Sequence, residues 1–179
     1  MNSFNQKILI VDDIEDNRFT LERRLSRNGY TAISQADCGK KALELVKEES
    51  FDLILLDLMM PDISGLNVLK ILKADPKNRG IPVVMVTAAD EIETTAECIS
   101  NGAEDYITKP INATLLKARV TACLEKKRFR DSEEHYLSKV EADKKRTQSF
   151  LKQILPEKIA EELNSSGLVR PRKYEDIAI

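Results

Sequence analysis

The sequence predicts an α/β fold in which a five-stranded parallel sheet carries helices on both faces and is followed by a long dimerising helix. Short apolar runs alternate with amphipathic segments through the first 124 residues, which is typical of successive βα units. Neither proline nor glycine occurs between Ile111 and Leu155, so the last helix is expected to run far beyond the usual length.

The first βα unit opens on the apolar run "KILIVDD", residues 7–13, which ends in two acids. The following segment, residues 15–29, places Phe19, Leu21 and Leu25 near one helical stripe and ends on Gly29, a common helix stop. We therefore expect a strand and then a helix.

The same alternation continues to residue 75. "YTAISQA" (30–36) is predicted to be a strand and "GKKALELVKEES" (39–50) a helix. "FDLILLD" (51–57) has the continuous apolar character of a strand buried on both faces. "GLNVLKILKAD" (65–75) is the expected third helix, closed by Pro76.

The last two units follow the same pattern. "IPVVMVTA" (81–88) is the fourth expected strand, and "DEIETTAECISNG" (90–102) is the fourth helix. "AEDYITKP" (103–110) is the fifth strand, and the final helix is expected to begin near Asn112.

Polar side chains stand at the carboxyl ends of four of these strands. The first strand ends in Asp12 and Asp13, the third in Asp57, the fourth in Thr87 and the fifth in Lys109. Right-handed crossovers bring the carboxyl ends of parallel strands to one crevice, where such sheets place their functional loops. We therefore expect three carboxylates, a hydroxyl and an ammonium to meet there.

Clustered carboxylates repel one another, and Mg²⁺, which takes oxygen ligands, relieves that repulsion. Asp57 could then attack phosphorus as a nucleophile, with Lys109 and Thr87 holding phosphoryl oxygens. Each residue also has an ordinary structural interpretation: an acid pair can cap a helix, and Thr or Lys–Pro can simply end a strand. The phosphoryl-transfer hypothesis rests on finding all of them in order.

From Lys7 to Leu124 the sequence resembles the response-regulator receiver family, whose domain has a flavodoxin-like fold. The motifs are "VDD" at 11–13, "LLDLMMPDISG" at 55–65, "VTA" at 86–88 and "NGAEDYITKP" at 101–110. The resemblance implies that a histidine kinase or phosphotransfer protein phosphorylates Asp57. It also implies that Mg²⁺ is bound by Asp13, Asp57 and the backbone carbonyl of Met59, with Asp12 assisting through water.

The resemblance further implies that Thr87 and Tyr106 form the switch pair of the family, although Tyr106 could be an ordinary half-buried strand aromatic. Two positions near the site, Met59 and Ala89, carry side chains that cannot hold a water by a hydrogen bond. We therefore expect the aspartyl phosphate to hydrolyse slowly.

The composition sets the wider limits. A formal net charge of -2 gives no general argument for nucleic acid or an anionic membrane as a partner. The three cysteines are odd in number and lack metal-ligand spacing, and no signal peptide or transmembrane run is present. These features predict a cytoplasmic protein with reduced thiols.

The domains expected are a receiver at 1–124, a coiled-coil linker at 125–155 and a short helix with the truncated start of an output domain at 156–179. The linker carries a heptad seam at Leu137, Val140, Lys144, Thr147, Leu151 and Ile154. Phe129 and Tyr136 fit another frame, which suggests a slipped register. A lone solvated helix is the alternative to a parallel homodimer. His135 is interpreted as an ordinary polar helix residue.

The tail "QILPEKIAEELNSSGLVRPRKYEDIAI" resembles the segment that leads into the catalytic domain of class III adenylate and guanylate cyclases. The catalytic residues of such a domain would lie after Ile179, so none is assigned here. The expected function is a receiver that controls a nucleotide cyclase through a dimerising helix. The alternative output is a phosphatase or a DNA-binding domain.

Overall fold

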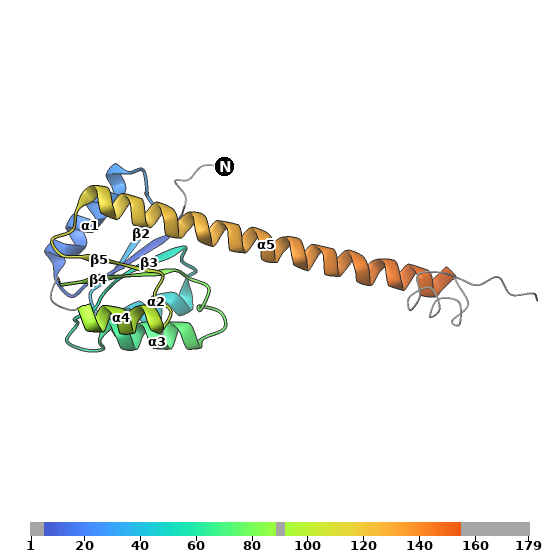
Figure 1. Ribbon diagram of the computed structural model, residues 1–179, viewed down its shortest axis with the longest axis horizontal. Helices are drawn as coiled ribbons and strands as arrows, with labels where there is room; N and C mark the ends of the chain where they lie inside the picture. The colour runs from blue at the N-terminus through green and yellow to red at the C-terminus, as the bar shows by residue number, and fades with distance from the viewer. Residues whose placement is uncertain (1–5, 89–91, 155–179) are drawn as a thin grey trace, which may run out of the picture. The chain divides into compact units, whose positions relative to one another are not determined.

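The computed structural model describes residues 6–88 and 92–154 (Figure 1). The chain divides into two compact units, Met1–Arg130 and Asp131–Ile179, which are treated separately below. The strands are β1 (Ile8–Val11), β2 (Ile33–Ala36), β3 (Leu53–Asp57), β4 (Val83–Thr87) and β5 (Asp105–Thr108). The helices are α1 (Glu15–Arg27), α2 (Gly39–Glu48), α3 (Gly65–Ala74), α4 (Ile92–Ser100) and α5 (Ala113–Ile154).

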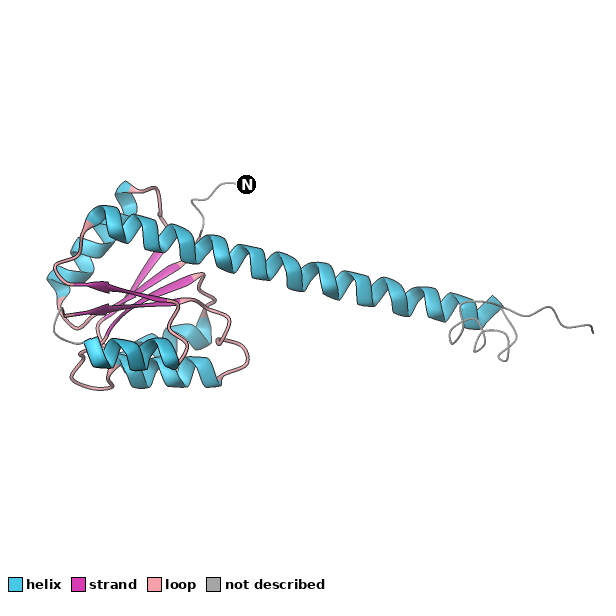
Figure 2. Ribbon diagram, in the orientation of Figure 1, coloured by secondary structure: helices cyan, strands magenta, loops and turns pink. Residues whose placement is uncertain are grey.

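The first unit is built around one parallel sheet with the strand order β2-β1-β3-β4-β5. Helices α1 and α5 cover one face of the sheet, and α2, α3 and α4 cover the other (Figures 1 and 2). This arrangement confirms the predicted fold class.

Alternate residues of each strand enter two separate cores, because successive side chains point to opposite faces. Ile8 and Ile10 of β1 pack with Leu21 and Leu25 of α1. Leu9 and Val11 join the other core, beneath α2, α3 and α4. Burial on both faces explains why the central strands are apolar almost throughout.

Helix α1 departs from the sequence-based expectation at one residue. Leu21 and Leu25 are buried as expected, but Phe19 is 59% exposed and its ring lies 5.8 Å from the guanidinium of Arg23. Phe19 lies two residues before Leu21, so a helix turns it well away from the core stripe. Gly29, with φ of 92°, stands at the predicted stop.

Helix α5 begins at a side-chain cap and packs tightly against the sheet. The Oδ1 atom of Asn112 accepts hydrogen bonds from the backbone N–H groups of Thr114 and Leu115, at 2.9 and 3.1 Å. Four α5 residues are buried in the core shared with α1, namely Leu116, Val120, Cys123 and Leu124.

Beyond Leu124, three basic residues of α5 tie it to loops that precede three strands. Lys127 pairs with Asp52, before β3, at 3.2 Å, and Arg130 donates to the carbonyl of Gly80, before β4, at 2.9 Å. Lys126 and Arg130 both pair with Glu104, before β5, whose side chain is only 11% exposed. We call these contacts the basal clasp.

The second unit continues α5 through exposed residues. Tyr136, Leu137, Val140 and Phe150 are between 46% and 67% exposed, and Arg146 lies 5.7 Å from the ring of Phe150. The short helix and cyclase-like segment expected at 156–179 lie outside the described residues. None of the helices described has both the length and the apolar character needed to span a bilayer.

Candidate functional site

The carboxyl edge of the sheet brings the expected acidic residues together. Asp57 is the last residue of β3, and Asp12 and Asp13 directly follow β1, its neighbour in the sheet. One carboxylate oxygen from each of the three lies within 4.8 Å of the others. Asp12 and Asp57 are buried, whereas Asp13 is exposed, so the cluster opens toward solvent on one side.

Lys109 supplies the positive charge of the cluster from the segment after β5. Its ammonium nitrogen lies 2.8 Å from Oδ1 of Asp57 and 3.1 Å from Oδ2 of Asp12. The peptide bond that follows Lys109 is cis. One lysine thus bridges two buried carboxylates carried by different strand ends.

The negative charge of the three acids exceeds the positive charge of Lys109. Burial raises the pKa of Asp57 to about 6, and the charges of Asp12 and Asp13 act in the same direction, against the hydrogen bond from Lys109. Burial alone would lower the pKa of Lys109, but its hydrogen bonds to Asp57 and Asp12 raise it. Three carboxylates facing one ammonium leave room for a divalent cation.

Two α1 residues that the sequence analysis did not single out hold the acidic loop. The side-chain amide of Asn17 donates to both carboxylate oxygens of Asp12, at 3.0 and 3.1 Å, and the backbone N–H of Ile14 donates to Oδ1 at 2.9 Å. Arg18 donates to the backbone carbonyls of Asp12 and Asp13, at 2.7 and 3.1 Å. The sequence offered one signal for these two residues, namely their positions about one helical turn after the two acids.

The loop after β3 is fixed by a glycine and by an acid. A Cβ at Gly65 would lie 2.0 Å from the backbone oxygen of Asp57, so only glycine allows α3 to start this close to the site. Asp62 accepts hydrogen bonds from the N–H groups of Gly39 and Lys40, at 3.1 and 3.0 Å, at the start of α2. Burial acts to raise the pKa of Asp62, but the hydrogen bonds from backbone N–H groups outweigh it and lower the pKa to about 2.

The remaining predicted residues surround the cluster. Thr87 ends β4 at 1% exposure, and its hydroxyl donates to the carbonyl of Ala88 at 3.0 Å. Tyr106 lies in β5 and is 41% exposed, and the Met59 side chain is 66% exposed. Ala89, named for its effect on phosphate lifetime, lies outside the described residues.

The donor set suits Mg²⁺. Asp12, Asp13 and Asp57 offer hard oxygen ligands on one open side, and no histidine or thiolate joins them among the residues described. Such a cation would neutralise charge on an incoming phosphoryl group beside the Asp57 carboxylate. The geometry therefore fits a metal-assisted phosphoryl acceptor.

Comparison with known proteins finds relatives over the part of the chain that forms the sheet. A family model for the response regulator receiver domain matches residues 8–121. Response regulator PleD of Caulobacter vibrioides is 44% identical over 114 residues, which cover 64% of this chain and 25% of PleD. A probable cyclic di-GMP phosphodiesterase of Vibrio cholerae is 40% identical over 124 residues, covering 69% of this chain and 28% of that protein.

A solved structure of a putative response regulator from Chloroflexus aurantiacus superimposes with a TM-score of 0.65 at 30% identity. It covers 68% of this chain and 98% of that one. The chain spans only about a quarter of the length of PleD and of the Vibrio protein. Over residues 8–121 the chain belongs to the response regulator receiver domain family, and this membership implies a phosphodonor such as a histidine kinase.

Proposed function

We propose that this receiver accepts a phosphoryl group on Asp57 from a histidine kinase or phosphotransfer protein. The observation that carries the proposal is the bridge from Lys109 to Asp57 and Asp12, at 2.8 and 3.1 Å, beside an exposed third acid. In the reaction an Asp57 oxygen attacks phosphorus, the bond from phosphorus to the donor nitrogen breaks, and an acyl phosphate forms.

The side chains around Asp57 have separate roles in the proposal. Asp13, Asp57 and the Met59 carbonyl would hold Mg²⁺, with Asp12 assisting through water, and the ion would supply positive charge to the transferred group. Lys109 already contacts Asp57 and would donate to a phosphoryl oxygen. Its flexible ammonium can follow the new group without losing its charge.

Thr87 and Tyr106 form the proposed switch. On phosphorylation the Thr87 hydroxyl would exchange the carbonyl of Ala88 for a phosphoryl oxygen. The Tyr106 ring, now 41% exposed, would then turn inward on β5. Buried Thr87 and half-exposed Tyr106 sit on neighbouring strands β4 and β5, which supports coupling between them.

The test of the phosphoacceptor is direct. Incubation of the protein with acetyl phosphate and Mg²⁺ should add one phosphoryl mass to the wild type, and Asp57→Asn should not accept it. Beryllofluoride should likewise bind only the wild type. If Asp57→Asn is labelled as fully as the wild type, another residue is the acceptor.

We further propose that the exposed part of α5 forms a parallel homodimer that controls a nucleotide cyclase. Support for the dimer comes from Leu137 and Val140, two apolar residues of the predicted heptad seam, which are 56% and 46% exposed on α5. Support for the cyclase comes from the sequence of residues 156–179 alone.

A different output is the alternative. The relatives include the Vibrio phosphodiesterase and a probable transcriptional regulator, ycf27, of Porphyridium aerugineum, which is 40% identical over 119 residues. Both are equally similar to this chain, at 40% identity, so similarity over the receiver does not indicate which output domain it controls. The test joins residues 1–179 to the catalytic domain of a class III cyclase and measures formation of cyclic AMP and cyclic GMP. Beryllofluoride with Mg²⁺ should change the rate in the wild type and not in Asp57→Asn, and an unchanged rate in the wild type would overturn the cyclase proposal.

A further inference from the structure

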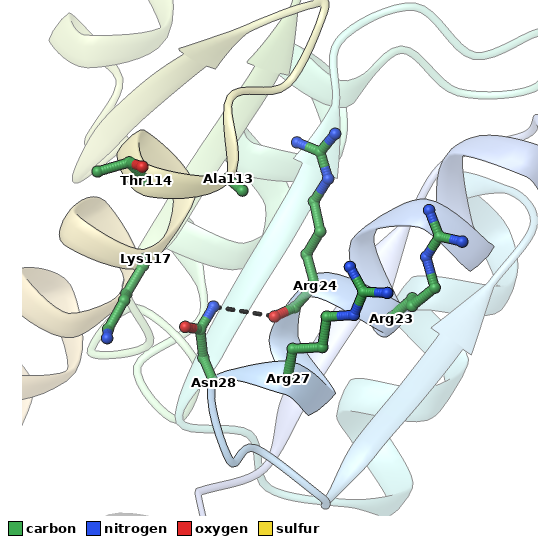
Figure 3. A pocket seen from close by; sticks show the side chains of 7 residues that line it. All are labelled: Arg23, Arg24, Arg27, Asn28, Ala113, Thr114 and Lys117. Atoms are coloured by element: carbon green, nitrogen blue, oxygen red, sulfur yellow. Dashed lines mark hydrogen bonds between the residues drawn. The ribbon is translucent and has the colours of Figure 1, made fainter.

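A basic hollow lies between the carboxyl end of α1 and the amino end of α5, away from the acidic cluster. Its volume is about 480 Å³, and it is lined by Arg23, Arg24, Arg27, Asn28, Ala113, Thr114 and Lys117. Figure 3 shows the arginines extending from α1 and Thr114 and Lys117 from α5, on opposite sides of the space. The size falls within the range of small-molecule sites.

The charge of this hollow is uncompensated. Four of the seven lining residues are cationic and none is acidic. Arg23 and Arg27 are four residues apart on one helix, where like charges repel. Within residues 6–88 and 92–154, none of the ion pairs identified involves any of the four cations.

Two of the arginines are held in place by contacts that leave their charge in full. Arg24 donates to the backbone carbonyl of Ile111, and the guanidinium of Arg23 lies over the ring of Phe19 at 5.8 Å. A carbonyl and an aromatic face orient a guanidinium without neutralising it. These side chains are therefore arranged before any anion arrives.

Helix electrostatics account for only part of this cluster. Arg24 and Arg27 lie in the last turn of α1, where the helix dipole favours cations. Lys117 lies near the amino end of α5, where the dipole does not favour a cation, and no acid occupies the first turn of that helix. The hollow thus combines three arginines of α1 with a lysine near the amino end of α5.

We propose that this hollow binds a small anion that carries two or more phosphoryl groups. Guanidinium groups match phosphoryl oxygens in paired hydrogen bonds, and the Thr114 hydroxyl adds a donor from the other wall. Charges on both walls can each meet one phosphoryl group of an extended anion.

The experiment is calorimetric titration of the full chain with inorganic tripolyphosphate and, separately, ATP, in EDTA without added metal. The test variant is Arg27→Gln with Lys117→Gln, which removes one charge from each wall. The control is Lys40→Gln with Lys47→Gln, which changes net charge equally at positions outside the hollow. Far-UV circular dichroism checks that both variants are folded.

We expect saturable one-site binding that weakens at least tenfold in the test variant and less than twofold in the control. ATP that binds more tightly than tripolyphosphate supports a nucleotide ligand, and equal affinity supports recognition of the phosphates alone. Equal weakening in both variants, no binding, or equally tight binding of a polyglutamate peptide would overturn the proposal. Asp57→Asn should bind like the wild type, which separates this site from the proposed phosphoacceptor.

Discussion

Replacing Asp57 by Asn should stabilise the metal-free receiver at neutral pH. The folded state raises the pKa of Asp57 from 3.8 to about 6, chiefly through burial, so the charged carboxylate is disfavoured by about 3 kcal/mol. Asn removes the ionisation and keeps a side chain of similar shape. The variant should therefore gain up to about 3 kcal/mol above pH 7.

The sign follows from proton binding. Between pH 3.8 and about 6 the folded protein holds a proton on Asp57 that the unfolded chain releases. The contribution of Asp57 to the free energy of unfolding therefore falls as pH rises through this window and stays low above it. Near pH 4 both proteins carry a neutral group at this position, so their stabilities should converge.

The assay is urea unfolding of residues 1–130, a compact unit, followed by far-UV circular dichroism from pH 4 to 7.5 in EDTA. The measured quantity is the difference in the free energy of unfolding between the variant and the wild type. The titration of unrelated acids such as Asp62 affects both proteins equally and cancels. Saturating Mg²⁺ should stabilise the wild type more than the variant and so reduce the difference at pH 7.5. A difference that is constant across this pH range would refute the reasoning.

Three further predictions concern the surrounding structure. Gly65→Ala should destabilise the receiver by about 1–3 kcal/mol, because its Cβ would meet the Asp57 carbonyl; an unchanged urea midpoint would contradict the contact. A chain that ends at Arg130 should sediment as a monomer while the full chain forms dimers, and persistence of the dimer would move the interface to the receiver. Met59→Asn should shorten the lifetime of the aspartyl phosphate, measured by loss of ³²P, because the amide can position water; Met59→Leu is the control and should hydrolyse like the wild type. About 1.4 kcal/mol of barrier corresponds to each tenfold change, and equal rates for both variants would exclude side-chain positioning as the control.

The sequence was sufficient for the fold because hydrophobic periodicity and strand ends follow directly from residue order. Leu53 to Leu56 are all fully buried in β3, as a continuous apolar run predicts. Topology then places Asp12, Asp57 and Lys109 at one edge, which needs no detailed geometry. The meeting of these side chains was therefore predictable.

Details that depend on side-chain direction were less predictable. Phe19 is apolar but exposed, because its position on α1 turns it away from the core and the Arg23 side chain covers its ring. Asn17 and Arg18 hold the acidic loop through hydrogen bonds whose partners cannot be read from residue order. The hollow lined by Arg27 and Lys117 likewise arises only when α1 and α5 pack together.

The basal clasp sets where this receiver can be cut and joined to another protein. Lys126, Lys127 and Arg130 lie after the last core residue, Leu124, yet each of the three is bonded to the receiver itself. In a chimera joined at residue 124, the other protein supplies everything after that residue. Glu104, at 11% exposure, would then lose both of the cations that it pairs with. A chimera that keeps residues 125–130 retains the ion pairs and the hydrogen bond of the basal clasp. The receiver unit that can be joined to another protein therefore ends at Arg130.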